Sequence, residues 1–292
     1  MLADPSLDEI LCISACFVDY GAQSNPGRTK HRDIVWMCGL STEPAVRVGL
    51  SSQVEQRHFA DELSMIIALV DWARESDPDI LCGYEVQQNS WGYVVKRAEL
   101  AYNINLCSEF SRVVERQPRR HLPPQLGREK GSRGHCKGAA IMVVGRHVLD
   151  VWRLMRGELS LTSYSFEKIA KEVLGEQNPH YPPHQLASWY SHGPAVSRIR
   201  ALQYVFCRAK TTLHILDKTG VIERAMEIAS VIGVDFGSVL MRSSQLRVES
   251  LMARIAHPEL YILASPTRAQ VAQQRAAEWS ATGSEATKPL LH

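Results

Sequence analysis

The chain has 292 residues, 45% of them hydrophobic and 22% charged, and its 33 Lys and Arg against 31 Asp and Glu give a formal net charge of +2. This composition is typical of a globular protein with a sizeable core, and no apolar run approaches the roughly 20 residues that a membrane-spanning helix needs. We therefore expect no membrane role, while the near-neutral charge neither requires nor excludes a nucleic-acid partner.

The first part of the chain predicts strands followed by a helix. Three apolar, β-rich runs predict strands, the first of them central: residues 10–18, 33–40 and 45–50. Residues 21–30 between the first two predict a turn or loop. From Phe59, apolar side chains recur at helical spacing, which predicts an amphipathic helix that ends near Ser76, where Pro78 prevents its continuation.

The second part continues with strands and then becomes helical. A strand over 79–83 leads into a helix over 89–102, and residues 141–152 predict another strand. An apolar stripe from Phe166 to Leu174 predicts a helix that Gly175 closes, and a longer stripe follows from Leu202 to Leu216. Strands interleaved with helices indicate an α/β domain with a mixed sheet and a helical C-terminal part.

A basic stretch lies between the last two predicted strands. Only Glu115 and Glu129 oppose its positive charges, which are Arg112, Arg116, Arg119, Arg120, Arg128, Lys130, Arg133 and Lys137. This pattern is typical of a solvated loop, and it is also typical of a loop that contacts phosphates.

Several blocks carry a resemblance to a known family. GYEVQQNSWGYVVKRA at 83–98 resembles the second exonuclease motif of the family B DNA polymerases, and the blocks at 145–177 and 204–216 resemble the segments that follow it. The block at 243–278 resembles the entry into the polymerase palm. The resemblance covers roughly residues 8–278 in the same order, and SWGY, RVES and the QQRA run point to one translesion branch of the family.

The resemblance implies a ribonuclease-H-like exonuclease domain over residues 1–222 and the helical start of a palm over 223–279. Residues 280–292 lose all periodicity and predict a disordered tail. The family's palm motifs, Ser-Leu-Tyr-Pro and Asp-Thr-Asp, do not occur in this sequence. We therefore expect that this polypeptide alone does not polymerise DNA.

Active family exonucleases hold two divalent metals with four carboxylates, because hard cations select oxygen ligands and clustered anions offset their charge. The matching positions carry no acid here: they are Cys16, Val18, Ser90 and Arg208, with the motif's tyrosine retained as Tyr204. An arginine about 4 Å from a metal site would oppose a divalent ion by roughly twice 4 kcal/mol at an effective dielectric near 20. We expect no metal binding and no nuclease activity. The seven cysteines form no CxxC pair, which also argues against zinc and fits reduced thiols in a cytosolic or nuclear protein.

Simpler interpretations stand beside this one. Cys16 and Val18 fit core positions on an apolar strand, Ser90 fits a residue that caps its own helix, and Asp150 fits a structural hydrogen-bond acceptor. Tyr204 and Arg208 lie one helical turn apart and predict a solvated or cleft-facing pair. The nearest acids that could rebuild a metal site are Asp19, Asp33 and Glu85, each of which also fits a strand end or a solvated face.

The first hypothesis is a fragment of a translesion DNA polymerase whose exonuclease-like domain serves structure and DNA binding. The resemblance implies a nuclear role in DNA repair or replication, a DNA primer-template, and accessory subunits that contact mainly other parts of the polymerase. We expect no cofactor in this chain, whereas the intact polymerase uses Mg²⁺. The predicted phosphate contacts are Arg119, Arg120, Arg128, Lys130 and Arg208. The alternatives are an active 3′-to-5′ exonuclease with relocated acids and a free-standing scaffold that binds nucleic acid or protein.

Overall fold

The computed structural model describes residues 3–19, 31–39, 54–113, 141–261 and 269–273. The chain divides into two compact units, Met1–Ile222 and Glu223–His292. The predicted loop at 21–30, the predicted strand at 45–50 and the predicted tail at 280–292 lie outside the described residues.

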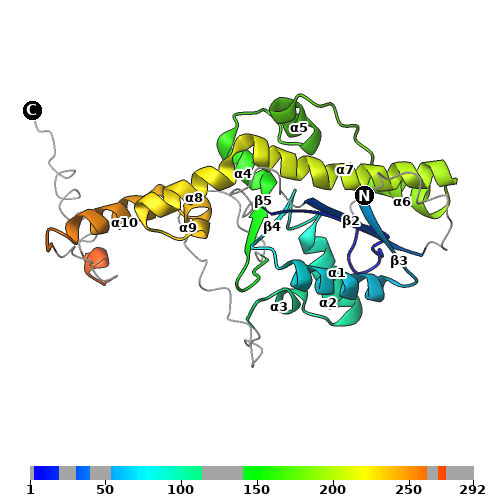
Figure 1. Cartoon of the computed structure of the whole chain (residues 1–292), viewed down its shortest axis with the longest axis horizontal. Coiled ribbons are helices and arrows are strands. Elements are labelled where there is room, and N and C mark those ends of the chain that lie inside the picture. The colour runs from blue at the N-terminus through cyan, green and yellow to red at the C-terminus, as the bar shows by residue number, and fades with distance from the viewer. Residues whose placement is uncertain (1–2, 20–30, 40–53, 114–140, 262–268, 274–292) are drawn as a thin grey trace, which may run out of the picture. The chain divides into compact units, whose positions relative to one another are not determined.

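The first unit contains a three-stranded mixed sheet (Figure 1). Strand β1 (Cys12–Val18) pairs antiparallel with β2 (His31–Cys38), and β2 pairs parallel with β3 (Val54–Phe59). The first two strands are the predicted ones. Strand β1 begins two residues later than the predicted range 10–18, and β2 is shifted by two residues toward the N-terminus from the predicted range 33–40. Strand β3, VEQRHF, was missed because four of its six residues are polar and give no apolar run. The predicted α/β class with a mixed sheet is confirmed.

A second, two-stranded sheet is parallel and consists of β4 (Ile80–Gly83) and β5 (His147–Asp150). The prediction of one strand over 141–152 was wrong at both ends. Helix α4 (Val151–Glu158) begins directly after Asp150, whose carboxylate accepts a hydrogen bond from the Trp152 backbone N–H at 3.2 Å. An aspartate at this position caps a helix, so the strand stops where the cap begins.

Helix α1 (Glu62–Ser76) begins three residues later than the pattern predicted, because Phe59 pairs with Cys38 in the sheet. The carboxylate of Asp61 accepts from the Ser64 backbone N–H at 2.9 Å and starts the helix, and Asp77 ends it in the left-handed conformation at φ 42°. The remaining helices of the first unit are α2 (Trp91–Tyr102), α3 (Leu106–Glu109), α5 (Phe166–Leu174), α6 (Pro183–Ser191) and α7 (Ala195–Thr219). As predicted, Gly175 closes α5, at φ +77°.

Helices cover both faces of the three-stranded sheet (Figure 1). On one face, Trp36 of β2 packs with α1, and its ring meets the ring of Trp72 edge to face at 5.3 Å between centroids. On the other face, Val35 packs with Tyr190 of α6 and Leu202 of α7. Successive side chains of a strand point to opposite faces, so β2 contributes to both clusters.

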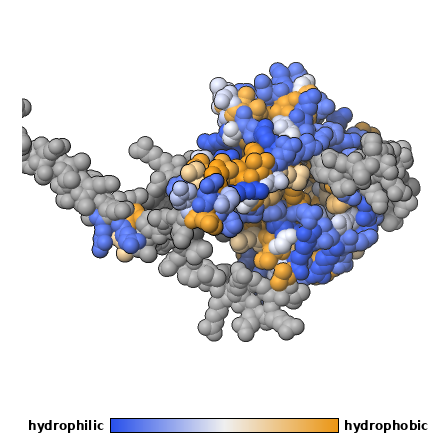
Figure 2. Space-filling view, turned by 60° about the vertical axis from the view of Figure 1, so that its left-hand side comes forward, coloured by the Kyte–Doolittle hydropathy of each residue, from blue (hydrophilic) through white to orange (hydrophobic). Residues whose placement is uncertain are grey.

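The second unit contains most of α8 (Val221–Ile232) together with α9 (Phe236–Met241) and α10 (Ser244–Ala256). Arg254 of α10 donates to the backbone carbonyls of Ser230 and Val231 at 3.1 and 2.7 Å, and so satisfies acceptors at the end of α8. Several apolar side chains of α10 are exposed: Val248, Leu251, Met252 and Ile255. Among the residues that Figure 2 colours by hydropathy, most on the visible face are hydrophilic, with hydrophobic patches between them. No helix in the described ranges is both long and apolar enough for a membrane span.

Candidate functional site

The carboxyl ends of β4 and β5 lie side by side and position the candidate site. Gly83, the last residue of β4, is the register partner of Asp150, the last residue of β5. Burial raises the pKa of the Asp150 carboxyl, although the backbone N–H groups that it accepts from lower it in part. The interpretation of Asp150 as a structural hydrogen-bond acceptor is confirmed.

Ser90 directly precedes α2 and lies against Gly83. A Cβ atom added to Gly83 would lie 2.5 Å from Ser90 Oγ, so only glycine allows this approach. The Ser90 side chain makes no capping hydrogen bond, which shows that the prediction of a self-capping serine was wrong. The backbone carbonyl of Ser90 instead accepts from Tyr93 and Val94 at 3.0 and 3.3 Å.

Cys16 and Val18 on β1 are half-buried, so the prediction that both are core residues holds only in part. The pairing of β1 with β2 places Cys16 opposite Asp33, and the Cys16 thiol donates to the Asp33 carboxylate. Burial raises the pKa of this thiol far above its usual range, Asp33 raises it further, and Lys210 of α7 opposes both. Cys16 is therefore a protonated thiol.

The third motif lies on α7 and borders a cleft of about 220 Å³. Its described lining comprises Phe166, Asn178, Pro179, Tyr181, Arg200, Gln203, Tyr204, Cys207 and Arg208. The predicted pairing of Tyr204 with Arg208 is confirmed, because Arg208 Nη1 donates to the Tyr204 hydroxyl at 3.0 Å and both residues face the cleft. Cys16, Val18 and Ser90, all in the described ranges, do not line this cleft.

The guanidinium of Arg208 has a carboxylate partner that the sequence did not reveal. Its Nη1 lies 3.3 Å from Oε1 of Glu167, the second residue of α5, and the same Oε1 lies 3.0 Å from Nδ1 of His180. Burial raises the pKa of Glu167, but its own backbone N–H, His180 and Arg208 outweigh burial and hold the pKa below its usual value. The local sequence SYSFEKIA does not predict this ion pair, because the partner of Glu167 is 41 residues away in the chain.

Two of the acids considered for a rebuilt metal site, Asp33 and Glu85, interact with different partners. Asp33 accepts from the Cys16 thiol, and Glu85, at φ 51°, accepts from the side chain of Asn89. In the described part of the chain, no group of three or more His, Cys, Asp or Glu side chains is arranged to hold a metal ion. The thiol of Cys16, the alkyl group of Val18, the hydroxyl of Ser90 and the guanidinium of Arg208 do not fit a pair of divalent metals, which require carboxylate oxygens.

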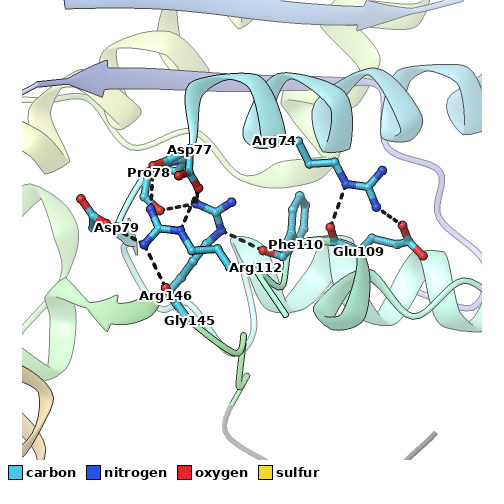
Figure 3. A network of polar contacts seen from close by, with 9 residues as sticks. All are labelled: Arg74, Asp77, Pro78, Asp79, Glu109, Phe110, Arg112, Gly145 and Arg146. Carbon is cyan, nitrogen blue, oxygen red and sulfur yellow. Dashed lines mark hydrogen bonds and ion pairs between the residues drawn. The ribbon is translucent and has the colours of Figure 1, made fainter. Parts of the chain in front are cut away.

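The base of the basic stretch is described, although residues 114–140 are not. Figure 3 shows the side chains of Arg112 and Arg146 converging on the turn after α1. Arg112 donates to the carboxylates of Asp77 and Asp79 at 2.8 and 2.7 Å, and Arg146 lies 2.9 Å from Asp77. Arg112 was predicted to belong to a basic loop with little opposing charge, and this was wrong because two acids distant in sequence pair with it. Arg116, Arg119, Arg120, Arg128, Lys130, Arg133 and Lys137 lie outside the described residues.

Backbone hydrogen bonds also join the two ends of the basic stretch. The Arg112 N–H donates to the Val144 carbonyl at 3.0 Å, and the Val144 N–H donates to the Ser111 hydroxyl at 3.1 Å. Arg146 Nε donates to the Phe110 carbonyl at 2.8 Å, and Arg74 pairs with the nearby Glu109 (Figure 3). The sequence gives one usable signal for this network, the clustering of Asp77 and Asp79 at the end of a predicted helix.

Comparisons with known proteins agree with the resemblance in the sequence. The family model for the DNA polymerase family B exonuclease domain matches residues 2–169. The DNA polymerase zeta catalytic subunit of Schizosaccharomyces pombe is 36% identical over 217 residues, which are 74% of this chain and 14% of that protein. The zeta catalytic subunit of Homo sapiens is 35% identical over 231 residues, 79% of this chain and 7% of that protein.

A delta catalytic subunit from Glycine max is less similar, at 28% identity over 230 residues, 74% of this chain and 19% of that protein. The branch of the family to which SWGY and RVES point is thus confirmed as the zeta branch. The chain spans a seventh or less of the length of these two zeta relatives. With more than half of its residues matched to the domain, the chain belongs to the family B DNA polymerases and carries their ribonuclease-H-like exonuclease domain.

Proposed function

We propose that this chain is the exonuclease-like part of a zeta-type polymerase and that it serves structure and DNA binding rather than hydrolysis. The observation that carries the proposal is Arg208. At the position of the fourth metal-binding acid, the cleft contains a guanidinium already paired with Glu167 and Tyr204. A cation fixed at this place repels divalent metals, and two-metal hydrolysis depends on those metals.

The other aligned positions support the same conclusion. Because its pKa is raised, the Cys16 thiol stays protonated at neutral pH and offers no anionic ligand. Val18 has no ligand atom, and Ser90 offers a neutral hydroxyl, which hard divalent cations bind far less strongly than a carboxylate. The four aligned positions thus supply none of the negative charge that would offset two metal ions.

The proposed partner is a DNA primer-template, which the chain meets through phosphate contacts. The proposed contacts are Arg119, Arg120, Arg128 and Lys130 in the basic stretch, together with Arg208 in the cleft. We further propose that residues 1–222 form the exonuclease-like domain and 223–279 the start of the palm. The proposed setting is nuclear translesion synthesis within DNA repair or replication, with accessory subunits that contact mainly other parts of the polymerase and Mg²⁺ bound at the palm of the intact enzyme.

Degradation of end-labelled single-stranded DNA in Mg²⁺ or Mn²⁺ tests the proposal. We expect no shortening of the strand beyond that in EDTA. A matched control is the triple variant Asp19→Asn, Asp33→Asn, Glu85→Gln, which removes the acids nearest in sequence. Metal-dependent digestion that survives purification and disappears in this variant would show an active exonuclease with relocated acids and would overturn the proposal.

A further inference from the structure

The contacts of Arg208 join two helices of the first unit. Phe166 and Glu167 are the first two residues of α5, whereas Tyr204 and Arg208 lie one turn apart on α7. The guanidinium carbon of Arg208 lies 4.2 Å from the ring centroid of Phe166 and 5.7 Å from that of Tyr204. The Arg208 side chain thus makes an ion pair and a ring contact to α5, and a hydrogen bond and a ring contact to Tyr204 within α7.

The Phe166 ring that Arg208 contacts is held in place by packing in the core. Phe166 is only 3% exposed, and its ring packs edge to face against Tyr84 at 5.2 Å. The Tyr84 hydroxyl donates to the Tyr164 carbonyl at 2.7 Å, which holds the segment before α5. A cation that stacks on a rigid, buried ring loses little further freedom on pairing, so the contact is favourable despite partial exposure.

Glu167 makes the position sensitive to the sign of the charge at residue 208. The side chain of Glu167 is 22% exposed, and its carboxylate has two cationic or donor partners, His180 and Arg208. An acid at position 208 would place a second negative charge beside this partly buried carboxylate. Like charges at this separation repel, and the repulsion is stronger where water is partly excluded.

We propose that Arg208 is the structural cross-link that holds α5 against α7, and that Glu167 makes any return of an acid at this position destabilising. This inference concerns the packing of the unit and is independent of whether the domain hydrolyses DNA, so each proposal can fail without the other.

Urea unfolding of four variants tests the charge coupling: Arg208→Gln, Arg208→Asp, Glu167→Gln and the double variant Glu167→Gln, Arg208→Asp. We expect Arg208→Asp to lower the unfolding midpoint more than Arg208→Gln does. In the Glu167→Gln background the added loss should largely disappear, because the repelling carboxylate is gone. Lys218→Gln, an exposed change near the end of α7, is the control and should leave the midpoint nearly unchanged.

Amide hydrogen exchange of the milder variant Arg208→Gln locates the effect even if Arg208→Asp does not fold. We expect exchange in α5 to become about fivefold faster, as the loss of a partly exposed pair implies, while exchange in α1 stays the same. Equal midpoints for Arg208→Asp and Arg208→Gln, or unchanged exchange in α5, would each overturn the cross-link.

Discussion

At Ser90, one small side chain fills the space that Gly83 leaves open beside the end of β4. A larger side chain at position 90 would clash with the closely packed backbone at Gly83, and a charged side chain would also need a partner of opposite charge. These are local demands of packing and charge, and they apply whether or not the neighbouring positions ever held a metal.

Restoring one acid at this place should not restore hydrolysis. We predict that Ser90→Asp shows no nuclease activity in Mg²⁺ or Mn²⁺, because two metals require several anionic ligands and Cys16, Val18 and Arg208 supply none. The measurement is strand shortening at high enzyme concentration, with Ser90→Asn as the uncharged control of similar size. Hydrolysis by Ser90→Asp but not by Ser90→Asn would mean that the other ligands are already in place.

At the scale of elements, a buried ion pair connects α1, α2 and the segment before β1. Glu62 and Arg97 are 4% and 6% exposed, and their charged groups meet at 2.9 Å. The Glu62 carboxylate also accepts from the Ile10 backbone N–H and the Tyr102 hydroxyl, each at 2.8 Å. Arg97 in turn donates to the Pro5 carbonyl at 3.2 Å, so this pair contacts all three segments.

Removing one partner should therefore loosen three segments at once. We predict that Glu62→Ala lowers the free energy of unfolding by about 3–5 kcal/mol, because it leaves the Arg97 charge buried without its carboxylate. Urea unfolding measures this loss. Glu75→Ala at the exposed end of the same helix, where the distance to Arg32 is 4.0 Å, is the control and should cost less than about 1 kcal/mol. Equal losses in the two variants would contradict the importance of the buried pair.

The elements that the sequence predicts well are those with a continuous apolar pattern, such as α1, α5 and β1. Strand β3 escaped prediction because it is mostly polar and depends on pairing with β2, which no local pattern records. In the candidate site, the resemblance located Tyr204 and Arg208, and their proximity follows from a single helical turn. The partners Glu167, Asp77 and Asp79 were missed because each pairs across more than thirty residues, and only the fold brings such residues together.

At the scale of the whole molecule, carboxylates with lowered pKa values make stability depend on pH. Burial raises the pKa of Glu62, but hydrogen bonds from Arg97, Ile10 and Tyr102 outweigh it and lower the pKa below the ordinary 4.5. The pKa of Glu167 is lowered as well. The unfolded chain therefore binds these protons first, and the stabilisation that is complete above the ordinary value disappears as pH falls through the lower folded values.

We predict a constant urea midpoint from about pH 7 down to the ordinary carboxyl range and a steady fall at lower pH. The variant Glu62→Gln should begin at a lower midpoint and fall less steeply, because it has one fewer carboxylate to protonate. A slope in acid that is the same with and without Glu62 would contradict its share of this linkage.

The proposed DNA binding is also a property of the whole molecule. We predict weak, sequence-independent binding whose affinity falls steeply with salt, because phosphate contacts release counterions. Neutralising Arg119, Arg120, Arg128 and Lys130 together should weaken binding equally for unrelated sequences and reduce the slope of log affinity against log salt by up to about 3. Fluorescence anisotropy over a salt series measures both effects, with Arg153→Gln, Arg156→Gln on α4 as the control. An unchanged slope would leave Arg208 as the remaining proposed contact.

The hydrogen bond between Arg112 and Val144 holds the two ends of the intervening segment together, so the stability of the fold depends little on the sequence between them. Once two chain ends are held together by contacts of their own, doubling the length of the connection costs only about 0.6 kcal/mol. A change in the length of the connection between Arg112 and Val144 should therefore cost the described sheet and helices little stability.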